Sequence, residues 1–351
     1  MTKLKLLKAA LATAAITTFT LPAFAQETTT LRIGNWLPPH HLIVSGILQP
    51  WADAIEAETD GSLQFELMTS ALGPPPAQFD LLLDQAFDVG YGVSGHNAGR
   101  FTMTQVMDLP FMSPDPWAGS AAAWQTYDRF GDDYGEHEGA HVVGLFVHSN
   151  PNINMADGRV ETLADLEGRT IRVGGNVTGR IMSELGASPV QLPPTEAQTA
   201  MARGVADGIT FPLESIDFFG ITPVINSITL VPGGLYTDTF WIAFNQDSWD
   251  ALTEEQQAAV TKHSGMAIAL LAGFAWTNGD TYGESQLIAN DVEFITLPEE
   301  DVAAAREILS PLETEWLEQA NERGFDGEAI LNYARAMVEH YDTARVVNVV
   351  Q

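Results

Sequence analysis

The sequence contains no cysteine and few basic residues, and both deficits exclude whole classes of protein. With no thiol among its 351 residues, the chain has no disulfide and no thiolate metal site, so packing must supply its stability. Only 16 residues are lysine or arginine, against 46 aspartates and glutamates. Because nucleic acid is bound by positively charged surfaces, we expect no nucleic-acid partner.

Sequence motifs for metal and serine chemistry are also missing. The adjacent His40 and His41, with His96 and His148 elsewhere, lack the spacing of a zinc site, so we expect no metal and no other cofactor. The segment 92–96 (GVSGH) lacks the second glycine of a serine-hydrolase elbow. The segment therefore does not favour catalysis by a serine. An exported hydrolase is the alternative from another functional class.

The first 25 residues have the pattern of a signal peptide. Lys3, Lys5 and Lys8 give a positively charged start, 6–21 is mostly apolar, and 23–25 (AFA) is a small-x-small cleavage pattern. The mature protein is then expected to be exported and to start near Gln26, a retained N-terminal anchor being the alternative. No later apolar stretch is expected to span a bilayer, so we predict no membrane insertion after cleavage.

Removal of the signal peptide makes the chain still more acidic. It takes away three lysines and no acid, which leaves 13 basic residues against 46 acidic ones and a net charge of about −33. The acidic residues form no long block, so they indicate a solvated surface. Attraction of a cationic or zwitterionic ligand is the alternative interpretation of the same charge.

Predicted strands alternate with predicted helices along most of the chain, which indicates an α/β fold with parallel strands. The most regular part is residues 168–212, where three short strands enclose two helices. Ligands of such units bind beyond the carboxyl ends of the strands. Arg172 lies near the end of the first strand, where its guanidinium is either an anion clamp or part of a buried ion pair.

The chain is long enough for two lobes. Strand-like sequence at 228–244 contains Gly233 and Gly234, as expected where the chain crosses back to the first lobe. A helix from 253 to 289 is long enough to lie across both lobes. We predict a first lobe of 26–149 plus about 238–275, and a second of 150–237 plus about 276–351, with bending at the hinge between them.

Several aromatic residues fall near predicted strand ends or crossings, where they can form an apolar pocket around a cationic clamp. The predicted wall consists of Trp36, Tyr91, Phe111, Phe211, Tyr236 and Trp241. Asn176, Thr210 and Asn245 are candidates for further polar contacts to a ligand.

The order and spacing of short motifs resemble one family over essentially the whole mature chain: the periplasmic solute-binding proteins of tripartite ATP-independent periplasmic (TRAP) transporters, of the DctP type. The motifs are LRIG (31–34), WLPPH (36–40), ALG (71–73), FDVG (87–90), LPF (109–111), LADLEGRTIRV (163–173), GASPV (186–190), GVADG (204–208) and Asn245.

This resemblance implies a two-lobe receptor, not an enzyme, that works in the periplasm. It closes over a small organic acid and delivers it to a sodium-driven membrane permease. The arginine of the family's Leu/Ile-Arg-Val strand pairs with the ligand carboxylate and corresponds to Arg172. The planar guanidinium suits such a two-pronged contact.

Two departures bear on the ligand. The sialic-acid-binding branch has an asparagine three residues after Asp-Gly, where this chain has Phe211, and acidic contacts where this chain has Pro74 and Pro75. The differences favour an apolar ligand, such as an aromatic or branched monocarboxylate. A C4-dicarboxylate or another polar organic acid is the alternative.

Overall fold

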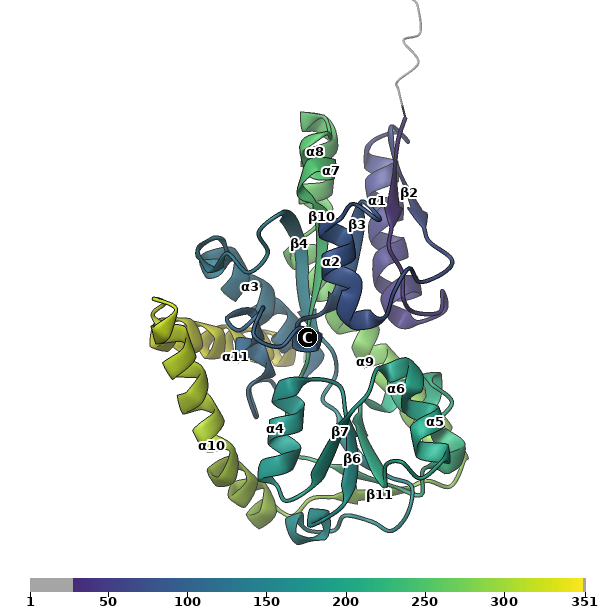
Figure 1. Ribbon diagram of the computed structural model, residues 1–351, viewed down its shortest axis with the longest axis vertical. Helices are drawn as coiled ribbons and strands as arrows, with labels where there is room; N and C mark the ends of the chain where they lie inside the picture. Colours follow the sequence, from purple (N-terminus) through teal and green to yellow (C-terminus); the bar gives the residue numbers. More distant parts are fainter. Residues whose placement is uncertain (1–27, 350–351) are drawn as a thin grey trace, which may run out of the picture.

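The computed structural model describes residues 28–349 of the chain, and the predicted signal peptide at 1–25 lies outside the described residues. Two lobes, each built on one β-sheet, lie one above the other in Figure 1. The predicted two-lobe α/β architecture is confirmed.

The first sheet has the strand order β2-β1-β3-β10-β4. Its first three strands are parallel, whereas β10 runs antiparallel between β3 and β4. In β1, Leu31 and Ile33 are buried and Arg32 is exposed, as a strand with one covered face requires. The strands are β1 (Thr29–Ile33), β2 (Leu63–Leu67), β3 (Val89–Val93), β4 (Ala140–Val147) and β10 (Thr239–Asn245).

Helices cover both faces of this sheet. The expected helix at 43–59 forms as a π-helical turn followed by an α-helix, and α3 begins earlier than its apolar pattern suggests. Asp115 explains that early start, because its carboxylate accepts hydrogen bonds from two amides of the first turn, just before Pro116. The elements are η1 (Ile43–Leu48), α1 (Gln49–Glu58), η2 (Pro75–Ala77), α2 (Gln78–Leu83), η3 (Ser94–His96), η4 (Thr104–Asp108) and α3 (Pro116–Tyr134).

The second sheet has the order β11-β9-β5-β8-β6-β7, and the predicted β-α-β-α-β unit forms its parallel strands β8, β6 and β7. The strand β5 was not expected, because two of its four residues are asparagines. Asn154 is buried, and its amide donates to the carbonyl groups of Ile209 and Phe211, which offsets the cost of burial. The strands are β5 (Asn152–Met155), β6 (Thr170–Val173), β7 (Ser188–Gln191), β8 (Gly208–Phe211), β9 (Ser227–Leu230) and β11 (Glu293–Thr296).

Short helices connect these strands. The chain leaves β9 through Gly233 and Gly234, both at positive φ, and returns to the first sheet as β10, as predicted. The connecting elements are η5 (Leu163–Leu166), α4 (Asn176–Glu184), η6 (Pro194–Glu196), α5 (Ala197–Ala202), α6 (Leu213–Phe218) and η7 (Thr222–Val224).

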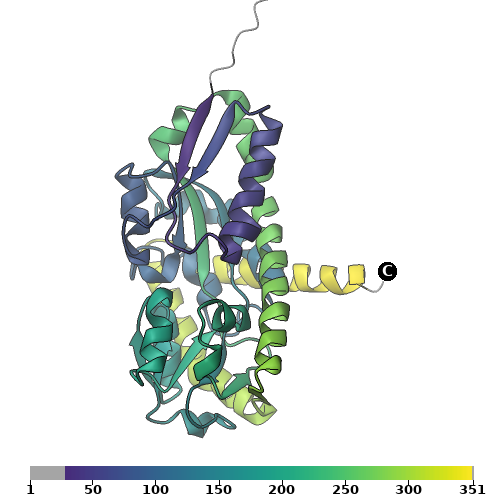
Figure 2. The same cartoon turned by 90° about the vertical axis from the view of Figure 1, so that its right-hand side faces the viewer.

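The long helix that spans both lobes is confirmed (Figure 2). After α7 (Gln246–Asp250), Thr253 and Gln256 form a capping box at the start of α8 (Glu254–His263). Gly265 separates α8 from α9 (Met266–Ala289). Along α9, Trp276 packs in the core of the first lobe and Leu287 in that of the second.

By length and composition alone, the stretch Glu254–Ala289 is apolar enough to cross a membrane. This differs from the expectation that no such stretch follows the signal peptide. A helix buried in a protein core passes the same test, and α9 packs against α3, β4 and α6. Packing between the lobes therefore accounts for its apolar character.

The predicted boundaries place both C-terminal helices, α10 (Glu299–Glu322) and α11 (Gly327–Val349), in the second lobe. In the structure, only part of α10 packs there. Leu309 of α10 packs in the core of the second lobe, whereas Trp316 further along the helix lies in that of the first. The buried face of α11, which includes Leu331 and Val338, packs against α3. The apolar face of a helix is stabilised by burial against another apolar surface, and for α11 that surface is on α3. The other lobe boundaries stay predictions.

Candidate functional site

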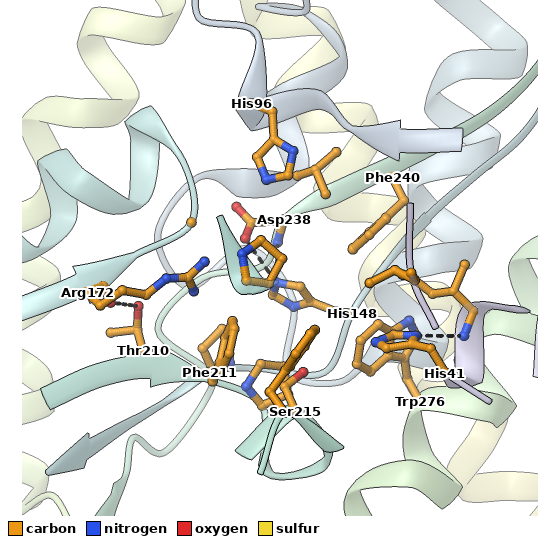
Figure 3. A pocket seen from close by; sticks show the side chains of 18 of the residues that line it. His41, His96, His148, Arg172, Thr210, Phe211, Ser215, Asp238, Phe240 and Trp276 are labelled. Atoms are coloured by element: carbon orange, nitrogen blue, oxygen red, sulfur yellow. Dashed lines mark hydrogen bonds and ion pairs between the residues drawn. The ribbon is translucent and has the colours of Figure 1, made fainter. Parts of the chain in front are cut away.

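A cavity lies between the lobes, with an empty volume of about 530 Å³. Strand ends of the second sheet, the start of η1, residues around η3 and the middle of α9 all contribute to its wall. Figure 3 shows Arg172, Phe211, Asp238 and Phe240 directed towards this space.

Arg172 is the cation of the cavity. It lies in β6 near the strand's carboxyl end and is 1% exposed. Its Nε donates to the carbonyl oxygen of Leu192 at 3.0 Å, and its Nη2 donates to the same oxygen. The guanidinium carbon lies 4.4 Å from the ring centre of Phe211, a distance typical of a cation-π contact.

Among the side chains that the structure describes, in residues 28–131 and 133–343, this guanidinium forms no ion pair with a carboxylate. Burial lowers its pKa to about 10, while the nearby Tyr236 and Asp238 act in the opposite direction. The side chain therefore remains charged at neutral pH, without an ion-pair partner among the described side chains.

The rest of the wall is largely aromatic. Of the predicted residues, Trp36, Phe211 and Tyr236 line the cavity. Sequence reasoning missed Phe219, Phe240 and Trp276, which also line it. Phe219 stacks on Phe211 with ring centres 5.6 Å apart. Helical periodicity places Trp276 on the buried face of α9, but it does not show that this face borders a cavity.

Thr210 also lines the cavity, but its hydroxyl already has protein partners. It accepts a hydrogen bond from the Tyr236 hydroxyl at 2.7 Å and lies 3.4 Å from the carbonyl oxygen of Arg172. The two side chains therefore brace the strand end that holds Arg172.

The other three predicted wall aromatics lie elsewhere, which corrects the expected wall. Tyr91 is buried behind Trp36 and stacks on it, with ring centres 5.5 Å apart. Trp241 packs in a core on the opposite face of β10, because alternate residues of a strand face opposite sides and Phe240 faces the cavity. Phe111 packs under Arg306, whose guanidinium carbon lies 4.0 Å from its ring centre.

The two predicted asparagines are also outside this cavity. Asn245 ends β10 far along the first sheet, where its side-chain oxygen caps α7 and its amide donates to the carbonyl of Leu82. Asn176 begins α4 and borders a separate groove, and its side-chain oxygen accepts from Gln105 at 3.4 Å. Asn245 therefore serves the fold locally as a helix cap, whereas Asn176 contacts the other lobe through Gln105.

Acidic and imidazole groups, which the sequence did not assign to the site, complete the cavity. Asp238, His148, His96 and His41 line it, whereas the adjacent His40 does not. The Nε2 of His148 lies 3.1 Å from Oδ2 of Asp238. In the described part of the chain, no group of three or more histidine and carboxylate side chains is placed to hold a metal ion.

His41 marks the junction between the lobes. Its Nδ1 accepts from the amide of Ile43 at 3.1 Å, and its Nε2 lies 3.9 Å from Oε1 of Glu214 in α6. Burial lowers the pKa of His41 to about 3 and raises that of Glu214 to about 8. Both side chains are therefore mostly neutral near pH 7, and their contact is not an ion pair.

Glycines bring the two lobes together over the cavity. A Cβ atom on Gly175, just before α4, would lie 3.2 Å from the carbonyl oxygen of Gly95 in η3. A Cβ on Gly95 would lie 3.7 Å from the Cα of Gly175. Because side chains are absent on both sides, the backbones of the two lobes approach closely here.

Two sheets joined by crossing strands and a long helix, with a buried cation in the cavity between them, define a two-lobed solute-binding protein. The chain belongs to family 7 of the bacterial extracellular solute-binding proteins, the DctP family, whose sequence pattern it matches over residues 33–319. The resemblance of its motifs to the receptors of TRAP transporters is thus confirmed.

Solved structures of similar proteins agree with this assignment to the family. A TRAP periplasmic solute-binding protein from Bordetella bronchiseptica, with bound (R)- and (S)-mandelate, is 33% identical. The match has a TM-score of 0.85 and covers 89% of this chain and 99% of that one. A TRAP solute-binding protein from Rhodoferax ferrireducens, in complex with copurified benzoate, is 27% identical with a TM-score of 0.85, over 91% of this chain and all of that one.

A relative from Comamonas testosteroni, described as the outer membrane transporter protein TsaT, is also similar over most of its length. It is 25% identical over 320 residues, which are 90% of this chain and 94% of the relative.

Proposed function

We propose that this receptor binds a small, relatively apolar or aromatic monocarboxylate between its lobes and delivers it to the membrane permease of its transporter. The observation that carries the proposal is the buried guanidinium of Arg172, which has no ion-pair partner in the described chain and faces the ring of Phe211. A ligand carboxylate supplies the missing negative charge, and exclusion of water strengthens the contact.

The cavity wall favours one carboxylate and an aromatic or branched body. Arg172 is the only lysine or arginine among its lining residues, so a second carboxylate would find no second cation there. Rings of Trp36, Phe219 and Phe240 offer apolar surface instead. The mandelate and benzoate bound by the two similar structures have the same combination of one carboxylate and one ring.

The same geometry supports a receptor over an enzyme. Ser94, the serine closest to a hydrolase motif, is buried, and its hydroxyl has no hydrogen-bond partner among the described residues. A nucleophilic serine needs a neighbouring base to take its proton. We further propose that residues 1–25 direct export to the periplasm, where the family's receptors meet their permeases.

Native mass spectrometry of freshly purified mature protein tests the proposal, together with thermal shifts for benzoate, succinate and glycine betaine. We expect a copurified or added monocarboxylate to bind and to raise the melting temperature, with little shift for the other two. A stronger shift with succinate would replace the proposal by a dicarboxylate receptor. A stronger shift with betaine would replace it by a receptor for cationic or zwitterionic ligands.

A further inference from the structure

A carboxylate lies inside a cavity that is proposed to bind an anion. Asp238, on the segment that leads into β10, lines the same cavity as Arg172 without forming an ion pair with it (Figure 3). A second negative charge here repels a carboxylate ligand. A carboxylate in this place therefore needs a function that offsets the repulsion of the ligand.

His148 contacts both the backbone amide and the carboxylate of Asp238. The Nδ1 of His148 lies 2.7 Å from the carbonyl oxygen of Ser149, and because a carbonyl only accepts, Nδ1 carries a proton. In the neutral ring, Nε2 then accepts a hydrogen bond from the backbone amide of Asp238 at 3.2 Å, and it donates to Oδ2 at 3.1 Å only when the ring carries a second proton. The other oxygen, Oδ1, accepts no hydrogen bond from the described residues.

Glycines leave this carboxylate uncovered. A Cβ atom on Gly95 would lie 3.7 Å from Oδ1, and one on Gly174 would lie 3.4 Å from Oδ2. Since neither position has a side chain, the carboxylate stays accessible from the cavity, where it lines the wall.

His96 supplies a second polar atom without a partner. Its ring lines the cavity, and its Nδ1 is buried with no hydrogen-bond partner in the described chain. The imidazole lies within electrostatic range of both Asp238 and Arg172. Buried polar atoms of this kind are nearly always paired, so a bound molecule is the expected partner.

A hydroxyl group matches the hydrogen-bonding capacity of these two atoms. It donates its proton to Oδ1 of Asp238 and accepts a hydrogen bond from Nδ1 of His96 when that nitrogen carries a proton. An ammonium group has three protons to place, yet Asp238 offers one free oxygen and the imidazole at most one further acceptor. The hydroxyl is therefore the better match.

We propose that Asp238 and His96 recognise a hydroxyl group on the ligand, so that the receptor prefers a hydroxylated aromatic acid over the same acid without the hydroxyl. This inference rests on the proposed function, because Arg172 must hold the carboxylate while the hydroxyl reaches Asp238 and His96. Without the hydroxyl, two buried polar groups lose water and gain no partner.

Calorimetry with two matched pairs of acids tests the proposal: mandelate with phenylacetate, and 3-hydroxybenzoate with benzoate. For the wild-type protein, we expect the hydroxylated member of at least one pair to bind about tenfold tighter or more. Phenylglycine, which carries an ammonium group where mandelate has its hydroxyl, should bind more weakly than mandelate.

The variant Asp238→Asn separates recognition from damage to the fold. It removes the repulsion, so the plain acid should bind more tightly, while the hydroxylated acid loses its charge-assisted hydrogen bond and binds more weakly. The preference then falls to within about threefold. A merely structural change would weaken both acids together. Asp84→Asn removes the same charge on an exposed surface and should leave the preference unchanged.

The outcomes distinguish the two proposals. If both members of each pair bind equally well to wild-type protein, the hydroxyl proposal is wrong and the monocarboxylate receptor stands. Tighter binding of phenylglycine than of mandelate would assign Asp238 to an ammonium group instead. If none of the aromatic acids binds and no other apolar monocarboxylate copurifies or raises the melting temperature, the proposed function itself fails.

Discussion

Two buried charged groups in this molecule have opposite surroundings. The carboxylate of Glu136 accepts hydrogen bonds from the amides of Met103 and Thr104 at 2.7 and 3.0 Å, and Arg323 lies 3.2 Å away. Arg172 is equally buried, but its only described hydrogen-bond acceptor is one carbonyl oxygen.

We propose that this difference separates a charge that serves the fold from one that binds the ligand. Glu136 joins the loop before α3 to the end of α10, and its hydrogen-bonding capacity is used within the protein. Arg172 keeps donor capacity that the protein does not use, next to a cavity. A buried charge whose partners are complete stabilises a fold, whereas an incomplete one is held ready for a ligand.

The largest expected effect is on ligand binding by Arg172. Arg172→Gln should weaken binding of the cognate acid about 100-fold or more, because the ligand carboxylate loses its charged partner. Calorimetry measures this loss. Arg169→Gln, on a half-buried arginine outside the cavity, serves as the matched control and should leave affinity within about twofold. Equal affinities of the Arg172 variant and the wild type would show that Arg172 does not bind the ligand carboxylate.

Glu136 should show the reverse pattern. Glu136→Ala leaves two amides and Arg323 without their acceptor, so unfolding free energy should fall by about 2–3 kcal/mol, with ligand affinity unchanged. Chemical denaturation gives the first quantity and calorimetry the second. Glu313→Ala, which removes an exposed partner of Arg335, should cost less than about 1 kcal/mol. A similar cost for both variants would contradict the distinction.

Glu214 offers a test by pH, because its pKa is raised to about 8 by burial. The folded protein holds this proton above the pH at which the unfolded chain releases it, so stability falls as pH rises towards 8. Between pH 6 and 8, the loss of unfolding free energy should be about 1–2 kcal/mol smaller for Glu214→Gln than for the wild type. Denaturation curves across this range measure it. An unchanged slope would mean that Glu214 is already ionised in the folded state.

The smallest effect is expected at the glycine contact over the cavity. Gly175→Ala places a methyl group 3.2 Å from the carbonyl oxygen of Gly95, which should hinder closure and weaken ligand binding about three- to tenfold. Gly179→Ala, one turn further in α4, meets only Val173 at 3.8 Å and is the control. If both variants bind alike, closure does not depend on this contact.

The sequence alone predicted the parts of the site that lie in regular local structure. Arg172 and Phe211 end neighbouring parallel strands of one β-α-β-α-β unit, and the ends of such strands share one edge of a sheet. Trp36, Thr210 and Tyr236 were likewise placed near strand ends, and all three line the cavity. The capping box at Thr253 and the long helix after it also follow from local pattern.

Only the tertiary structure decided which face each side chain presents. An error of one residue in the register of β10 assigns Trp241 to the cavity in place of Phe240, because successive residues of this strand enter different cores. Asp238 and His148 are 90 positions apart and meet only through the crossing of the chain. The sequence thus determined the family, the α/β units and the cation. Packing of the lobes decided which rings surround that cation and which carboxylate faces it, since those contacts join distant segments and leave no local pattern.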